Sequence, residues 1–175
     1  SEKDEVITRV ETELRRVKTE DRDVARRVKE ELEDLKRRLE RVIEDNERTL
    51  RELKKELKER NKPDDEAERL LEKSREVAER VLRKLEEIIK RIEEEIKKML
   101  DESEKIVEEI RDVVRRKGVD EDVVRELEKL LRDWEKRSRE VEEKLRRLLD
   151  ELRETLKEIE KELRRLDKEI KERLR

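Results

Sequence analysis

One acidic side chain, one indole and two hydroxyls lie within or beside the apolar positions of this chain, and their types could carry specific chemistry. They are Asp21, Ser103, Trp134 and Ser138. An ionised carboxylate only accepts hydrogen bonds and an indole N–H only donates them, so these groups can satisfy one another when buried. A carboxylate could instead act as a general base, but that role needs a substrate cleft, which close-packed helices do not offer. We therefore predict a structural polar layer and no catalytic residue.

A second, weaker set of polar residues has the same character. Asn46 and Ser74 interrupt apolar positions, and Thr49 lies at the edge of the same helical face. Single serines and threonines are common in helices without a special role, which is the simpler interpretation of this set. The alternative prediction is a second polar layer that joins two helices through Asn46 and Ser74, with Thr49 as a further candidate member.

The apolar residues around these positions recur at intervals of eighteen. Eighteen residues make about five turns of an α-helix, so every member of a column returns to the same face. A seven-residue repeat would impose a left-handed supercoil, whereas this interval predicts long helices with almost no twist. The columns include Val6, Val24 and Val42; Leu14, Leu32 and Leu50; Leu70, Ile88 and Ile106; and Leu127, Leu145 and Leu163.

Breaker residues divide the chain into three predicted helices, over about 2–60, 64–117 and 120–174. Pro63, the only proline, marks the first turn, where Asn61 can end one helix and Asp64 can cap the next. Gly118, the only glycine, marks the second turn. There we expect a Schellman ending, with Val119 against the preceding helix and Asp120 capping the following one.

Short turns make sequential helices antiparallel, so the sequence predicts an all-α, up-down-up three-helix bundle as a single domain over 1–175. When positions are paired outward from the two turns, Asp21 falls level with Ser103, and Ser103 falls level with Trp134. The apolar stripes cover only the inside of such a bundle. We therefore expect a monomer that requires no partner, with a designed oligomer or a domain swap as the alternative.

Composition argues against most classes of activity. Asp, Glu, Lys and Arg make up 62% of the chain, the net charge is −3, and there is no histidine or cysteine. The two signs are interspersed, so we expect no nucleic-acid partner. The residue types leave no basis for a nucleophilic triad or a Gly-rich phosphate loop, and we expect no metal and no cofactor. No apolar run is long enough for a signal peptide or a membrane span, so we expect a soluble, untargeted protein, suited to recombinant cytoplasmic expression, whose cellular location is unknown.

Over its whole length the chain resembles computationally designed, parametrically generated three-helix bundles. The resemblance rests on the eighteen-residue columns, the confinement of Pro63 and Gly118 to turns, and the absence of His, Cys, Phe and Tyr. It implies a hyperstable scaffold with no natural biochemical function and no enzymatic activity. The alternatives are a natural interaction rod, similar to spectrin-like repeats or a coiled-coil adaptor, and one component of a designed helical assembly or binder.

Overall fold

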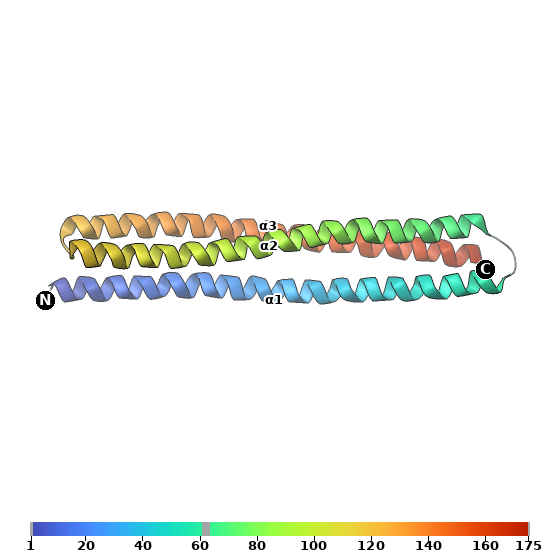
Figure 1. Ribbon diagram of the computed structural model, residues 1–175, viewed down its shortest axis with the longest axis horizontal. Coiled ribbons are helices and arrows are strands. Elements are labelled where there is room, and N and C mark those ends of the chain that lie inside the picture. Colours follow the sequence, from blue (N-terminus) through green and yellow to red (C-terminus); the bar gives the residue numbers. More distant parts are fainter. Residues whose placement is uncertain (1, 61–63, 175) are drawn as a thin grey trace. The chain divides into compact units, whose positions relative to one another are not determined.

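The chain is an all-α three-helix bundle (Figure 1). The computed structural model describes the backbone of residues 2–60 and 64–174 and the side chains of residues 4–60 and 64–173. Its helices are α1 (Glu2–Glu59), α2 (Asp65–Lys117) and α3 (Glu121–Leu174), and the described residues contain no strand. The predicted fold class is confirmed, and the helix ends lie within about one residue of those expected from the breakers.

Asp64 begins α2 as a helix cap. Its Oδ1 accepts a hydrogen bond of 3.1 Å from the backbone N–H of Ala67, and its carbonyl accepts one of 3.1 Å from the N–H of Glu68. A side-chain oxygen at this position satisfies a donor that the first turn leaves unpaired. The predicted roles of Asn61 and Pro63 fall on residues outside the described part of the chain.

Gly118 ends α2 in the left-handed conformation, with φ 77°, as the sequence predicts. Its N–H donates to the carbonyl of Val114 at 3.1 Å, which is the single bond of an αL ending. Among the described residues no additional backbone bond from the N–H of Val119 is made, so the predicted Schellman ending is wrong in this detail. Asp120 caps α3, since its Oδ1 accepts a bond of 2.9 Å from the N–H of Val123.

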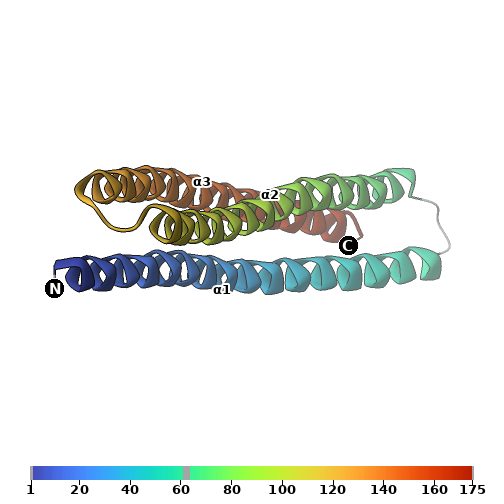
Figure 2. The ribbon, with the colours of Figure 1, turned by 60° about the vertical axis from the view of Figure 1, so that its left-hand side comes forward.

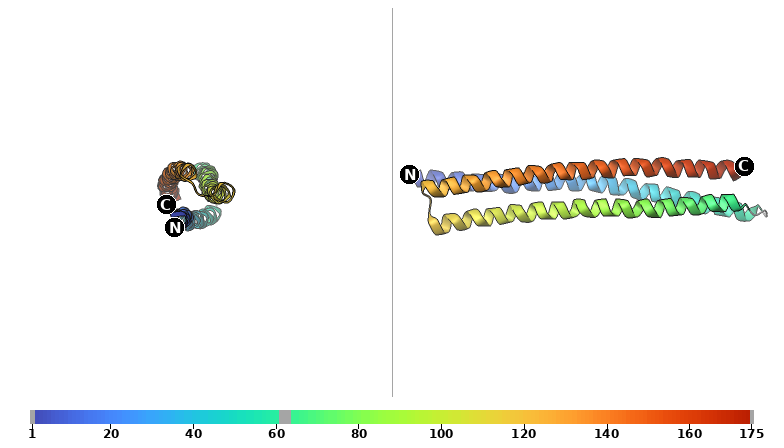
Figure 3. Two further views of the ribbon diagram at one scale, coloured as in Figure 1. Left: turned by 90° about the vertical axis from the view of Figure 1, so that its left-hand side faces the viewer. Right: turned by 90° about the horizontal axis from the view of Figure 1, so that it is seen from above.

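Contacts divide the chain into two compact units, which we describe separately. Unit 1 consists of Ser1–Glu30 and Arg91–Leu148, and unit 2 of Glu31–Lys90 and Leu149–Arg175. Each unit contains one segment from each helix, and within each unit the α2 segment runs antiparallel to the other two (Figures 2 and 3). That all three helices form one cooperative domain stays a prediction.

The core of unit 1 is built from the apolar columns of all three helices. Side chains on one face of each segment are removed from water, which is the main favourable contribution to folding. Its buried cluster is formed by Leu14 and Val17 of α1, Ile106, Val107, Ile110 and Val113 of α2, and Val123, Leu127 and Trp134 of α3.

In the core of unit 2, the apolar side chains of α3 are more completely buried than those of α1 and α2. A buried cluster joins Leu53 of α1, Ala67 and Leu71 of α2, and Ile170 of α3. Every described apolar side chain of α3 in this unit is buried, whereas α1 and α2 each leave several half-exposed. The half-exposed apolar residues are Val42, Ile43, Leu50 and Leu57 of α1 and Leu70, Ala78, Val81, Leu82 and Ile89 of α2.

Candidate functional site

Asp21 is the most buried acidic residue of unit 1, with 1% of its surface exposed. The Trp134 indole Nε1–H donates to its Oδ2 at 3.0 Å, and the Ser138 hydroxyl donates to its Oδ1 at 2.7 Å. Trp134 and Ser138 lie one turn apart on α3, so they approach the carboxyl from the same side. The structure thus brings together Asp21 and Trp134 at the level expected from the turns, and gives Ser138 the shorter bond.

Ser103 of α2 lies at the same level and is 4% exposed. Burial raises the pKa of Asp21 above its ordinary value of 3.8, and hydrogen bonds from Ser138, Trp134 and Ser103 lower it in that order without cancelling the effect. A carboxylate in a dry environment loses hydration that a few donors replace only in part. Ser103 therefore contributes to the environment of the carboxyl, whereas the direct hydrogen bonds of 2.7 and 3.0 Å to Asp21 come from Ser138 and Trp134.

Arg16 lies beside this layer at the surface between α1 and α3. Its guanidinium forms an ion pair with Glu135 of α3, and its Cζ lies 6.0 Å from the centroid of the Trp134 ring. The hydrogen bonds that Arg16 donates to Glu135 and then to Glu13 raise the pKa of Arg16, so its positive charge is held there. A cation over an indole face is attracted by the ring quadrupole, which helps to hold Trp134 in the orientation that reaches Asp21.

The second predicted set is only partly assembled. In unit 2 the Ser74 hydroxyl donates to Oδ1 of Asn46 at 3.3 Å, and the two residues are 0% and 5% exposed. The structure therefore brings together Asn46 and Ser74 as a two-helix contact between α1 and α2. Thr49 is half-buried, and within the described chain it makes no side-chain hydrogen bond to either residue.

Two polar residues of α3 in unit 2 escaped the sequence interpretation. Thr155 is 6% exposed, and Asp167 is half-buried with an Oδ1 that has no hydrogen-bond partner among the described residues. Burial also raises the pKa of Asp167. Asp167 directly follows the core residue Leu166, so its position at the edge of the apolar stripe was the sequence feature that could have indicated its burial. Many other charged residues of this chain lie at the same edge and are exposed to solvent, so this feature does not single out Asp167.

The geometry at Asp21 suits a structural role better than a catalytic one. Both carboxyl oxygens already accept hydrogen bonds, and the side chain is almost inaccessible to solvent. A general base must reach a substrate proton directly or through one water, which this burial prevents. Among the described residues no group of acidic side chains is arranged to hold a metal ion, and no helix is apolar enough over a sufficient length to cross a membrane.

Comparisons with known proteins give no relative from which a role could be transferred. No protein-family model, curated protein or solved structure matches the chain.

Proposed function

We propose that this chain is a designed structural scaffold, a hyperstable three-helix bundle with no natural biochemical function, in which a buried hydrogen-bond network around Asp21 specifies the alignment of the helices. The observation that carries the proposal is the pair of hydrogen bonds from α3 to the two oxygens of Asp21. Such bonds contribute only about 1 kcal/mol each to stability, because water offers equivalent partners in the unfolded chain. Their larger effect is to destabilise alternative alignments of the helices, in which these hydrogen bonds are broken.

The apolar columns by themselves leave several alignments nearly equivalent. A helix displaced along its neighbour by whole turns would still place Leu, Ile or Val against Leu, Ile or Val. The same displacement would leave the Asp21 carboxyl and the Trp134 N–H buried without partners, at a cost of about 1–3 kcal/mol for each group. A single matched layer therefore penalises wrong alignments while it adds little to the right one.

Distance measurements between spin labels test this role. The chain has no cysteine, so Thr19→Cys and Arg137→Cys place two labels on exposed positions of α1 and α3 within unit 1. We expect one narrow distance distribution in the parent. A broader or split distribution should follow when Asp21→Leu, Ser103→Ala, Trp134→Leu and Ser138→Ala are combined.

A matched control removes the polar pair of unit 2, with Asn46→Leu and Ser74→Ala, and should leave the distribution in unit 1 unchanged. An unchanged narrow distribution in the variant that lacks the Asp21 layer would overturn the specifying role.

Thermal unfolding followed by circular dichroism tests the scaffold role separately. We expect no transition below about 90 °C, and a cooperative transition at about 45–65 °C, as in ordinary mesophilic domains, would contradict it.

A further inference from the structure

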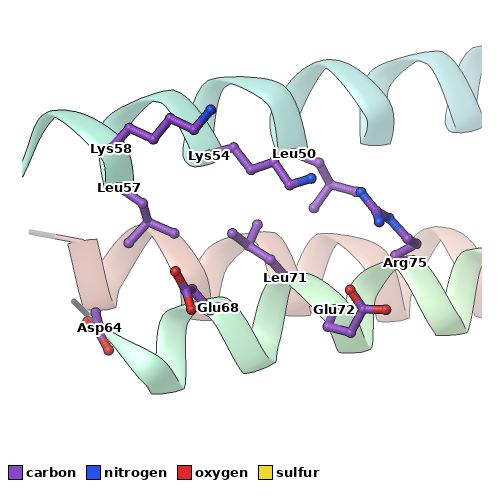
Figure 4. A pocket seen from close by; sticks show the side chains of 9 residues that line it. All are labelled: Leu50, Lys54, Leu57, Lys58, Asp64, Glu68, Leu71, Glu72 and Arg75. Carbon is purple, nitrogen blue, oxygen red and sulfur yellow. The ribbon is translucent and has the colours of Figure 1, made fainter.

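A groove between α1 and α2 within unit 2 leaves several apolar side chains partly exposed. Two hollows of about 420 and 320 Å³ lie along it and share Leu50, Lys54 and Arg75 as lining residues. We call this surface the α1–α2 groove. Figure 4 shows its wider hollow, where Leu50 and Leu57 of α1 point toward Leu71 of α2.

The floor of the groove is apolar, and its apolar residues follow helical spacing. Ile43, Leu50 and Leu57 recur at intervals of seven on α1, and Ala78 and Leu82 are one turn apart on α2. All five side chains are half-exposed, although the chain has no fully exposed large apolar side chain among its described residues. A strip of this kind accepts the apolar face of another helix, and contact with such a face would complete its burial.

The two rims of the groove carry opposite charge. The α1 rim contains Arg51, Lys54 and Lys58, with Glu47 as the exception, and the α2 rim contains Asp64, Glu68, Glu72 and Glu79, with Arg75 as the exception. Lys54, Lys58, Glu68 and Glu72 make no ion pair within the described chain. By contrast, Arg38 of α1 pairs with Glu160 of α3, and Arg173 of α3 pairs with Glu66 of α2. Arg173 also pairs with Asp64 at 3.1 Å, so the rim residues that can pair with an occupant of the groove are Lys54, Lys58, Glu68 and Glu72.

Asn46 adds an independent polar feature to the floor. It lines the smaller hollow and is 5% exposed, and its only side-chain hydrogen bond within the described chain is the one that its Oδ1 accepts from Ser74. The two amide N–H groups of this side chain have no partner there. The buried side-chain atom without a partner among the described residues is Asp167 Oδ1, so the Asn46 amide nitrogen is accessible from the hollow and can donate to a polar side chain on the occupant.

We propose that the α1–α2 groove of unit 2 is a docking site for one amphipathic helix from another chain, which converts this unit from three helices to four. The helix presents a Leu/Ile stripe to the floor, a hydrogen-bond acceptor at the level of Asn46, an acidic flank to α1 and a basic flank to α2. A second folded copy fits less well, because its own groove is hollow at the same place and two concave faces leave the space unfilled.

The length of the groove sets the length of the occupant. Residues 43 to 58 of α1 span about 24 Å at the rise of an α-helix, which a partner helix of about 16–18 residues matches. A four-helix arrangement would then bury the apolar residues that the three helices leave half-exposed.

Three synthetic helical peptides of about 18 residues test the proposal by fluorescence anisotropy. All three share a Leu/Ile stripe with one Asn, and they carry one Glu and one Lys flank, two Glu flanks or two Lys flanks. We expect saturable one-to-one binding of the mixed peptide, at least about tenfold tighter than that of either single-charge peptide, because each surface pair changes affinity only a few-fold and several act together. No binding of the mixed peptide at about 1 mM would overturn the site.

Variants of the α1 rim provide the matched comparison. Lys54→Glu changes a groove-lining residue, whereas Lys55→Glu makes the same change at an exposed neighbour that lines neither hollow. We expect Lys54→Glu to weaken binding of the mixed peptide about three- to tenfold and to favour the peptide with two Lys flanks, with no change for Lys55→Glu. Equal effects of the two substitutions would overturn the assignment of the rim.

Light scattering measures whether the protein alone forms a dimer. A dimer that dissociates on Leu50→Glu would assign the groove to a second copy instead.

Discussion

The indole Nε1 of Trp134 lies 3.0 Å from Oδ2 of Asp21, and the two residues are 3% and 1% exposed. This bond joins positions 113 residues apart, so it exists only when α1 and α3 have folded in one alignment. The effect of this bond on folding stability depends on whether the Asp21 carboxyl is ionised. Burial disfavours the ionised form.

Asp21→Asn tests the cost of burying that charge. The asparagine can accept from Trp134 and donate to Ser138, so both bonds have a neutral replacement. Because the folded pKa of Asp21 is raised, its contribution to stability is greatest when protonated and is lost as pH rises from 3.8 through the folded value. We expect the variant to be about 1 kcal/mol more stable at pH 7, with the difference shrinking toward pH 3, by denaturant unfolding. A destabilised variant at pH 7 would show that the carboxylate itself is required.

Trp134 is the only tryptophan, so its fluorescence reports the environment of the layer without interference. We expect blue-shifted emission and poor quenching by acrylamide, because the side chain is 3% exposed. Trp134→Phe removes the N–H donor and keeps a ring against Arg16. It should cost about 1–3 kcal/mol, measured by chemical unfolding, because the carboxyl loses a partner while remaining buried. Water-like emission from the parent protein would show that the layer is open.

Glu160 should show the opposite dependence on pH in unit 2. Its Oε1 and Oε2 accept bonds of 2.7 and 3.0 Å from Arg38, which lower the pKa of Glu160 from its ordinary value of 4.5. The stability it contributes is present above pH 4.5 and is lost as pH falls through the folded value. Glu160→Gln should cost about 0.5 kcal/mol at pH 7 and nothing at pH 2 in urea unfolding, with the exposed Glu158→Gln as control.

Asp167→Asn tests the orphaned oxygen of unit 2. The carboxyl is half-buried, its Oδ1 has no partner among the described residues, and burial raises its pKa. Removing the charge should stabilise the protein by about 0.5–1 kcal/mol at pH 7, and the gain should disappear as pH falls below the folded pKa. The same exposed control, Glu158→Gln, should show no gain by calorimetry. An equal gain in both variants would indicate a general effect of net charge.

Gly118→Ala tests the turn between α2 and α3. An added Cβ would meet no atom within 4 Å, so the expected cost comes from the backbone, whose φ is +77°. We expect a loss of about 1 kcal/mol, with a smaller loss for Gly118→Asn, because asparagine adopts left-handed conformations more readily than alanine. Thermal or chemical unfolding measures both, and an Ala variant as stable as the parent would contradict the strain argument.

The amino-acid sequence by itself determined the helices and the level of the Asp21 layer. Columns at intervals of eighteen define which face of each helix is apolar, and one proline and one glycine define where each helix stops. Once the turns are short, pairing outward from them brings Asp21 to the level of Trp134. The apolar faces, the helix ends and the level of the layer all depend on where residues lie along the chain, and the spacing of residue types in the sequence gives that directly.

Only the tertiary structure decided how closely the helices approach and which edge positions are buried. Periodicity gives the angle of a side chain about its helix but not the separation between helices or the conformation of a long side chain. For that reason the unpaired Asp167 was missed, the half-exposed strip through Leu50 was expected to be covered, and Thr49 did not join Asn46 and Ser74. Burial depends on the neighbours that pack against a position, and those neighbours come from distant parts of the chain.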